Sequence, residues 1–252
     1  MPASITWYGQ AGFVIEGGSA RVGVDLFLRP DARLRAPFCT PDAIPPLQAA
    51  FCTHEHHDHL DPYTLKGLQG NHPGMEVVVP APVRPLAEEA GLQHVVGAEP
   101  RQVFHYGEIM VEPVMSLHAS EMSEGYHFGQ PPGRFLGYVF RVGDTVIYHS
   151  GDTLMYPELP GELKARGVAV LLLPINGRSF QREASGLVGN LTPEEAADLA
   201  AQAGAQALIP MHWDTYPHNR GDIGQAAEWA YRRQVTLIVP RYGQKVRVDE
   251  FR

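Results

Sequence analysis

Apolar residues recur along the chain in short alternating or continuous runs, which is typical of strands separated by tight turns. The alternation from about Ile5 to Ile15 predicts one strand, the following GGS a turn, and 21–27 the second strand of a hairpin. FLGYVFRVGDTVIYHSGDT predicts another hairpin, with its turn at Gly143 and Asp144. The continuous runs AAFCT and VAVLLLP are typical of short strands that are buried on both faces.

Helix signals alternate with these strands. The segment TPEEAADLAAQAGA is the strongest, because Thr192 and Glu195 form a capping-box pattern, Pro193 stands at the first helical position and Gly204 follows the last turn. This pattern predicts a helix that begins at Pro193 and ends before Gly204.

Weaker signals complete the set of elements. Asp61 is a predicted cap for a helix that begins at Pro62, VRPLAEEAGL and residues 224–233 predict further helices, and 237–248 predicts a last pair of strands. Helices alternating with strands and antiparallel hairpins indicate an α/β fold of mixed sheets covered by helices.

The two halves of the chain have a similar order of elements. In each half a hairpin ends in an acidic residue, Asp25 or Asp152, and a buried strand, a helix and another strand follow. This order predicts two stacked α/β halves. The sequence contains no linker, so residues 1–252 are predicted to form a single domain.

Composition narrows the class of protein. The net charge of −8 argues against a nucleic acid or an anionic membrane surface as the main partner, since both require a basic face. No apolar run is long enough to span a bilayer. Cys39 and Cys52 are too few for a disulfide framework, and the amino-terminal residues lack the apolar core of a signal peptide, so a cytoplasmic protein is predicted. The sequence does not fix the oligomeric state and is compatible with a homo-oligomer.

The most informative segment is THEHHDHLDP, directly behind the buried strand AAFCT. It has the pattern H-x-H-x-D-H, formed by His54, His56, Asp58 and His59. Imidazole and carboxylate are the usual ligands of zinc and related divalent ions, and loops at strand ends are where rigid scaffolds place functional residues. The alternative is an exposed polar loop, in which such crowding of ligand residues is rare. His57 is predicted to be an exposed bystander.

Three further ligand-type residues follow apolar strands. They are His118 after EPVMSL, Asp152 after TVIYHSG, and His212 after QALIPM. A single histidine at a strand end is more often a hydrogen-bonded structural residue. Together with the cluster, however, these residues complete a set of seven ligands that is sufficient for a two-metal site.

These motifs and their order resemble the metallo-β-lactamase fold superfamily. ITWYGQAGF, GVDLF, YHSGDT, PMHWD and LPINGR followed by GNLTPEEAADLA look like its branch of ascorbate-6-phosphate lactonase and relatives, over the stretch from Ile5 to about Asp214. The resemblance implies an αββα sandwich with the metals at one edge between the sheets. It also implies one ion on His54, His56 and His118, a second on Asp58, His59 and His212, and Asp152 as the bridge.

The chemistry of such a site is hydrolysis by a metal-bridged hydroxide, with Asp58 as the catalytic carboxylate that orients the hydroxide and accepts its proton. The ligand set suits two divalent ions of zinc, manganese or iron. We therefore predict a binuclear, lactonase-like hydrolase of a small-molecule ester or lactone, with a phosphorylated substrate left open. The alternatives are a phosphodiesterase acting on a nucleotide or phospholipid head group, and a non-catalytic metal-binding protein. The chain has no G-x-S-x-G motif and no phosphate-cradling glycine-rich loop.

Residues around the site have two interpretations each. Asp25 is either a partner of a metal-bound histidine or a turn acid, and His149 is either such a partner or a buried structural residue. Arg178 is either a clamp for an anionic substrate or the partner of an acid in its own loop or in the helix that begins at Pro193. The candidate substrate contacts are Asn176, Arg178 and Arg182 in NGRSFQR, and Tyr126, His127 and Arg134 in the loop 119–134, which is predicted to form a mobile rim of the site.

Overall fold

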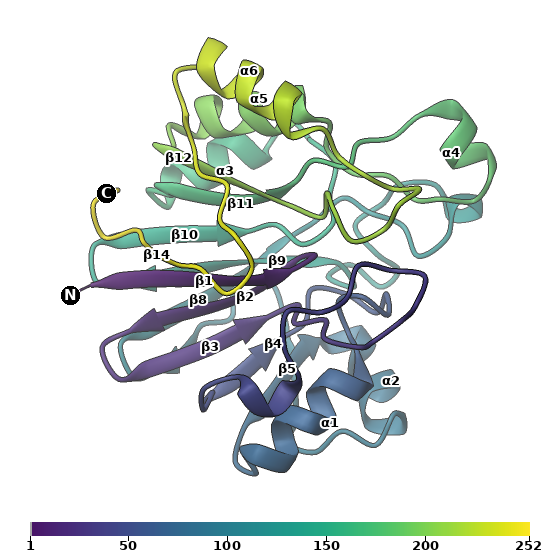
Figure 1. Ribbon diagram of the computed structural model, residues 1–252, viewed down its shortest axis with the longest axis vertical. Coiled ribbons are helices and arrows are strands. Elements are labelled where there is room, and N and C mark those ends of the chain that lie inside the picture. The colour runs from purple at the N-terminus through teal and green to yellow at the C-terminus, as the bar shows by residue number, and fades with distance from the viewer. Residues whose placement is uncertain (1) are drawn as a thin grey trace.

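The computed structural model describes residues 2–252 as two β-sheets that face each other, with helices on both outer faces (Figure 1). Each sheet has seven strands, and each contains both parallel and antiparallel pairs. This four-layer αββα arrangement confirms the fold class that the sequence predicts. The two chain ends lie on the same side of the molecule, and α4 projects on the opposite side (Figure 1).

The first sheet is built from the first 98 residues and one carboxyl-terminal strand, in the order β14-β1-β2-β3-β4-β5-β6. Strands β1 to β3 are antiparallel, and β3 to β6 are parallel. Helices α1 and α2 cover its outer face (Figure 1). The elements are β1 (Ala3–Gly9), β2 (Gly12–Gly17), β3 (Ala20–Val24), β4 (Ala49–Phe51), α1 (Pro62–Asn71), β5 (Glu76–Pro80), α2 (Arg84–Glu89), β6 (Val95–Ala98) and β14 (Lys245–Arg247), with 3-10 turns η1 (Pro41–Ala43) and η2 (Ala81–Val83).

The second sheet repeats this plan in the order β13-β12-β11-β10-β9-β8-β7. Strands β7 to β10 are antiparallel and β10 to β13 are parallel, while α3, α5 and α6 cover the outer face. The elements are β7 (Phe104–Tyr106), β8 (Ile109–Met115), η3 (Met122–Glu124), β9 (Leu136–Val142), β10 (Thr145–His149), α3 (Leu159–Ala165), β11 (Val170–Pro174), α4 (Phe180–Ala184), α5 (Pro193–Ala203), β12 (Ala207–Met211), α6 (Ile223–Arg232) and β13 (Thr236–Leu237).

Apolar side chains between the sheets hold the two halves together. Phe51 of β4 packs on Tyr138 and Phe140 of β9, with ring centroids 4.9 and 5.7 Å apart. All three are buried, and Tyr138 donates a hydrogen bond to the Cys52 carbonyl across the interface. Burial of aromatic rings is a large source of stability, so this contact fixes the end of β4 against the second sheet.

The structure corrects two predicted elements. The stretch from Ile5 to Ile15 is two strands rather than one, because the chain turns at Gly9 (φ 103°) and Gln10 (φ 49°). The predicted final strand pair is not a pair, since β13 joins β12 whereas β14 joins β1 of the other sheet. The first correction matters for function, because the turn places Gln10 at the edge where the ligand-type residues lie.

The helix signals are confirmed in detail. Thr192 Oγ1 accepts the Glu195 N–H at 3.2 Å, and Glu195 Oε2 accepts the Thr192 N–H at 2.9 Å, which completes the capping box of α5. Gly204 ends α5 in the left-handed conformation, with φ 74°. Asp61 caps α1 by accepting the backbone N–H groups of the first turn.

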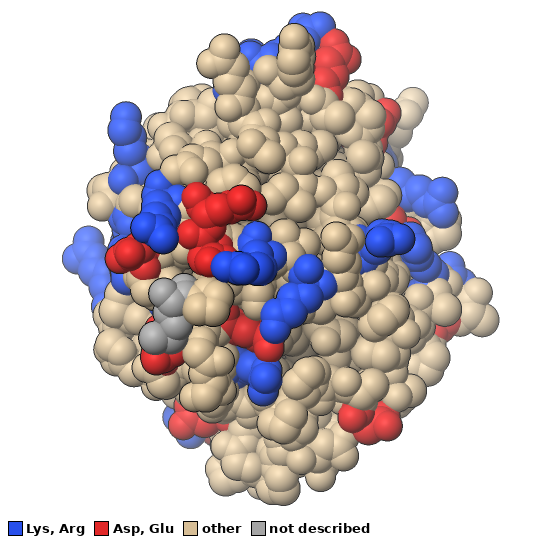
Figure 2. Space-filling view, turned by 60° about the vertical axis from the view of Figure 1, so that its left-hand side comes forward, with Lys and Arg blue, Asp and Glu red and all other residues tan. Residues whose placement is uncertain are grey.

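Charged side chains of both signs are interspersed on the face seen in Figure 2, where Lys and Arg lie beside Asp and Glu. Ion pairs between such charges include those of Glu16 with Arg21 and with Lys245. Within residues 2–252, no helix combines the length and the apolar character that crossing a membrane would need.

Candidate metal centre

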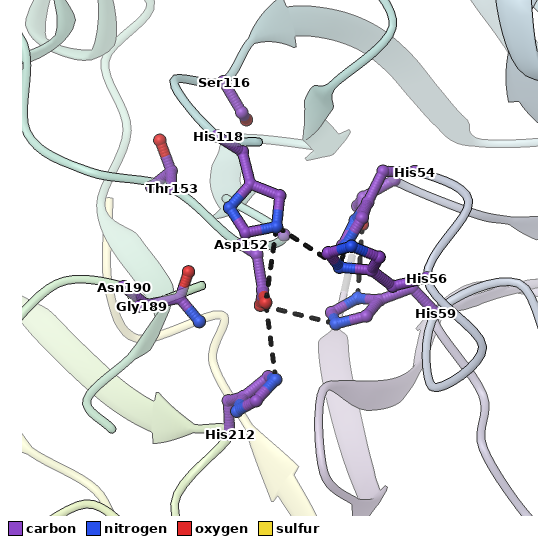
Figure 3. A network of polar contacts seen from close by, with 12 residues as sticks. His54, His56, His59, Ser116, His118, Asp152, Thr153, Gly189, Asn190 and His212 are labelled. Carbon is purple, nitrogen blue, oxygen red and sulfur yellow. Dashed lines mark hydrogen bonds and ion pairs between the residues drawn. The ribbon is translucent and has the colours of Figure 1, made fainter. Parts of the chain in front are cut away.

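The seven predicted ligands come from four loops that meet at one edge of the sandwich, and Figure 3 labels all of them except Asp58. The loop after β4 supplies His54, His56, Asp58 and His59, and the ends of β8, β10 and β12 are followed by His118, Asp152 and His212 respectively. Carboxyl ends of parallel strands meet at one edge of a sheet, which explains why residues so far apart in sequence converge. Each sheet contributes ligands, so the centre exists only when the two halves pack together.

One group of side chains consists of His54, His56, His118 and Asp152, whose ligand atoms all lie within 4.8 Å of one another. His54 Nε2 lies 2.9 Å from His56 Nδ1, and His118 Nε2 lies 3.4 Å from the same atom. Three ring nitrogens therefore point at one small volume (Figure 3). This arrangement is the one that three histidine ligands of a single ion require.

The second group is Asp58, His59 and His212. His212 Nε2 lies 3.4 Å from Asp58 Oδ2 and 3.4 Å from Asp152 Oδ2. Asp152 Oδ1 lies 3.3 Å from His59 Nε2, while its Oδ2 is 3.9 Å from His118 Nε2 in the first group. Asp152 thus lies between the two groups and within reach of residues of both.

The electrostatics of these residues fit metal ligands. Burial lowers the pKa of His118 to about 3 and that of His54 well below its usual value, so both imidazoles are neutral and offer lone pairs. Burial raises the pKa of Asp152, but His212 and His59 outweigh it and hold this pKa well below its ordinary value. His59 Nε2 and Asp152 Oδ1 are buried atoms without a hydrogen-bond partner. Such atoms are costly unless something else binds them, and a divalent cation would do so.

The structure distinguishes the two interpretations that the sequence allows for Asp25 and for His149. Asp25 Oδ2 accepts the His59 Nδ1 proton at 2.7 Å, and the two carboxylate oxygens of Asp25 also accept the N–H and hydroxyl of Thr53. Asp25 therefore orients His59 and leaves its Nε2 for a ligand. His149 is structural: its Nε2 donates to the Ala11 carbonyl at 2.8 Å, and its Nδ1 accepts the Gly151 N–H at 3.1 Å.

Gln10 belongs to the site although the sequence pattern did not indicate it. Its Nε2 donates to Asp58 Oδ2 at 2.8 Å, and its carbonyl accepts the His212 backbone N–H at 3.1 Å. The carbonyl also accepts the Trp7 indole proton. One residue of the β1–β2 turn thus holds two members of the second group in place.

A cavity of about 250 Å³ opens beside the two groups. Asp58, Asp152, His56 and His212 form its floor, and residues of the loops after β4, β8, α4 and β12 form its walls. The wall residues are Ser120, Gly186, Leu187, Val188, Tyr216, His218, Asn219 and His57. His57 is exposed, as predicted, but it also takes part in the rim of the cavity, where its Nε2 and the Tyr216 hydroxyl lie 3.0 Å apart in a hydrogen bond.

A family model described as the beta-lactamase superfamily domain matches residues 11–213, which contain all seven ligand-type residues. The chain belongs to this superfamily. The match confirms the predicted superfamily, but it specifies no branch within it, so the closer resemblance to ascorbate-6-phosphate lactonase stays a prediction.

Other members of the superfamily match nearly the whole chain. The chain is 24% identical, over 94% of its length and 97% of the relative's, to a protein of Exiguobacterium sp. named UPF0173 metal-dependent hydrolase. A protein of the same name from Caldivirga maquilingensis is 28% identical, with 86% of this chain and 85% of the relative covered. The crystal structure of Igni18 from Ignicoccus hospitalis, described as a metallo hydrolase, has a TM-score of 0.77 at 18% identity, with 99% of each chain covered. This structural likeness supports the shared fold.

The substrate contacts predicted from sequence do not line the cavity of this superfamily member. The His127 ring faces Glu124, at 3.3 Å, and Arg134 forms an ion pair with Glu55 at 2.7 Å. Asn176 is buried, and its amide donates to the Asn219 side chain and accepts from that of Asn190. It therefore contacts the cavity wall only indirectly, through Asn219. Within the loop 119–134, Ser120 is the residue that lines the cavity, and the mobility of this loop stays a prediction.

Arg178 requires a correction. Its Nη1 and Nη2 each donate to a different oxygen of Glu195 in α5 at 2.6 Å, and Nη1 also donates to the Asn190 carbonyl. The Glu195 hydrogen bonds raise the pKa of Arg178 further. The guanidinium is therefore held in a bidentate pair with the capping-box glutamate, as the second interpretation of the sequence has it, and does not face a ligand in the cavity.

We expect Arg178→Ala to lower stability rather than to change substrate preference. The loss of two charge-assisted hydrogen bonds in a largely covered pair costs about 1–2 kcal/mol after solvent screening. Thermal melting should fall by a few degrees, and the rates on anionic and neutral substrates should fall together. Arg84→Ala, which removes an exposed i,i+4 pair with Glu88, serves as the control with little effect. If the variant lost activity on the anionic substrate alone, Arg178 would have to be assigned to substrate binding.

Proposed function

We propose that this chain is a binuclear metal-dependent hydrolase that splits a small carboxylic ester or lactone with water. The observation that carries the proposal is the convergence of seven ligand-type side chains in two groups, beside one cavity that His56, Asp58, Asp152 and His212 line. Relatives along nearly the whole chain bear the name metal-dependent hydrolase, which supports the same class. We further propose that residues 1–252 act as one unit, since both sheets supply ligands.

The donor set fits two divalent ions. His54, His56 and His118 would hold one, Asp58, His59 and His212 the other, and Asp152 both. Nitrogen and carboxylate oxygen donors of this kind suit zinc, manganese or iron. Bound there, the ions would supply Lewis acidity, which lowers the pKa of water and stabilises negative charge that develops on the substrate oxygen.

The chain's own residues supply the proton transfer. Asp58 lines the cavity as a carboxylate: burial raises its pKa, but His59 and His212 hold that pKa well below the usual range. The Gln10 amide fixes the orientation of this carboxylate, so its oxygens are positioned to accept a proton from water in the cavity. Asp25 holds the His59 ring by its Nδ1, so that Nε2 is directed at the second group.

The cavity size favours the small ester or lactone over the phosphodiesters of nucleotides and phospholipids. Its volume of about 250 Å³ is below the range of about 300–1,000 Å³ that is typical of sites for drug-sized ligands. The test is to incubate metal-loaded protein with a panel of lactones, carboxylic esters and phosphodiesters. Turnover of a lactone or ester is the expected result. Two bound ions with no turnover of any substrate would favour the non-catalytic metal-binding protein instead.

We expect Gln10→Met to weaken the second group without unfolding the protein. Methionine fills the space of the side chain and keeps the backbone carbonyl that accepts from His212, so the variant removes only the hydrogen bond to Asp58. Loss of such a partner typically costs about 10–100-fold in metal affinity or activity. Metal titration should show one ion bound more weakly, with kcat reduced.

The matched control is Gln225→Met, which removes a glutamine-to-aspartate hydrogen bond at the start of α6, away from the site. It should leave metal binding and kcat unchanged. Equal metal affinity in Gln10→Met and the wild-type protein would show that the contact with Asp58 has no positioning role.

A further inference from the structure

The walls of the cavity carry no lysine or arginine. The charged groups that the chain itself presents there are the carboxylates of Asp58 and Asp152 and the imidazoles beside them. Proteins that recognise a carboxylate or phosphate on a substrate usually supply a cation that can bind it, most often an arginine in bidentate geometry. The composition of this cavity therefore indicates a substrate without such a group.

Three arginines outside the cavity are already paired. Arg178 binds Glu195 through both outer nitrogens, Arg134 binds Glu55 at 2.7 Å, and Arg29 binds Asp61 at 2.9 Å. Each of these pairs would have to break before the arginine could bind a substrate. None of the three arginines lines the cavity.

Arg182 is the arginine that could bind an anionic group of a substrate. It lines an adjoining hollow that shares Gly186, Leu187 and His218 with the cavity, and its Nη1 donates to the Asn176 carbonyl at 2.7 Å. Its Nε and Nη2 are buried and have no partner, so they could bind an anion if the loop after α4 moved. Arg182 is therefore the position that an experiment on substrate charge has to include.

The remaining wall offers apolar contact. Leu187 and Val188 are half-buried beside the cavity, and the Tyr216 ring stacks on His212 with centroids 6.4 Å apart and planes at 21°. The Tyr216 hydroxyl is occupied by His57, so its ring face is the part available to a ligand. Burial of an aliphatic or aryl group against such surfaces is favourable in proportion to the apolar area removed from water.

We propose that the cavity takes a small uncharged ester or lactone whose aliphatic or aryl group packs on Leu187, Val188 and the ring of Tyr216. This inference rests on the proposed function and names its substrate class. In the reaction the oxygen of water bonds to the acyl carbon and the bond from that carbon to the ester oxygen breaks. One proton of the water ends on the leaving alkoxide, and the other is released, so that an alcohol and a carboxylate result.

The test compares two esters with the same leaving group, 4-nitrophenyl butanoate and the singly charged 4-nitrophenyl glutarate. Protein loaded with zinc or manganese is assayed on both, and the spontaneous hydrolysis of each ester is subtracted. We expect kcat/KM to be at least about tenfold higher for the uncharged ester, because the glutarate carboxylate finds no lysine or arginine on the walls.

Variants of the wall locate the cause of the preference. Leu187→Lys adds a cation and should narrow or reverse the preference, whereas Leu187→Met should keep it. Val188→Lys is the second variant, in case the first does not fold, as judged by thermal melting. Phe180→Ala is the control, because this side chain is 85% exposed on α4 and does not line the cavity. Arg182→Gln should leave the ratio of the two rates unchanged.

The possible failures are distinguishable. Hydrolysis of the glutarate ester as fast as, or faster than, that of the butanoate ester would overturn the uncharged substrate class. If Arg182→Gln then slowed the glutarate ester selectively, Arg182 would be the residue that binds its carboxylate. Hydrolysis of bis(4-nitrophenyl) phosphate with neither carboxylic ester turned over would leave a hydrolase standing and overturn this inference. No turnover of any of the three by metal-loaded protein would overturn the proposed function, and the inference with it.

Discussion

Removal of the divalent ions with a chelator is expected to abolish hydrolysis, and zinc, manganese or iron should restore it. The floor of the cavity is made of ligand-type side chains, so the proposed reaction depends on the ions that they would hold. Without the ions, buried atoms such as His59 Nε2 and Asp152 Oδ1 have no partner. Activity and metal content should therefore fall and recover together, with close to two ions per chain at full activity.

Thermal melting provides a second measurement on the same samples. A ligand that binds only the folded state at 100 times its Kd stabilises it by about 2.7 kcal/mol. For a chain of this size that corresponds to a loss of about 5–10 °C in Tm when the ligand is removed. Full activity in protein from which zinc, manganese and iron have been removed would contradict the metal reading of the site.

The ligand set and much of the fold could be predicted because their signals are local. The H-x-H-x-D-H pattern lies within six consecutive positions, and the capping box of α5 spans four. Each of the other ligands directly follows an apolar strand, and strand ends of parallel pairs meet at one edge. Local patterns of this kind depend little on what the rest of the chain does.

The features that the sequence did not indicate depend on contacts between distant segments. The turn at Gln10 is hidden because the apolar alternation continues on both sides of it, and its amide meets Asp58 48 positions further along. The separation of β13 from β14 depends on which strand each one joins. Arg178 and Arg134 could not be distinguished from free cations, since their partners Glu195 and Glu55 are identified only by the folded structure.

Asp152→Ala is expected to reduce kcat/KM by well over a hundredfold, more than the roughly 10–100-fold typical of residues that only support a ligand. Asp152 lies between the two groups: its Oδ2 is 3.4 Å from His212 Nε2 and 3.9 Å from His118 Nε2, and its Oδ1 is 3.3 Å from His59 Nε2. Alanine would remove a donor from both ions at once and leave their charge less compensated. Elemental analysis should therefore show fewer than two ions per chain.

Two further variants separate ligation from a purely structural role for Asp152, which also follows the tight turn at Gly151 (φ 59°). Asp152→Asn keeps the volume and the side-chain oxygen but removes the charge. If the carboxylate bridges two ions, Asn should resemble Ala in metal content and rate, because a neutral amide offers one weak donor oxygen where two charged ones are needed. If Asp152 only shapes the turn, Asn should resemble the wild-type protein.

The control is Asp144→Ala, at the exposed turn that precedes β10, which removes an acid from the other end of the same strand. It should change neither metal content nor rate. Two tightly bound ions and normal turnover in Asp152→Asn would leave the bridging position to be filled by some other group, and the assignment of both ions would have to be revised.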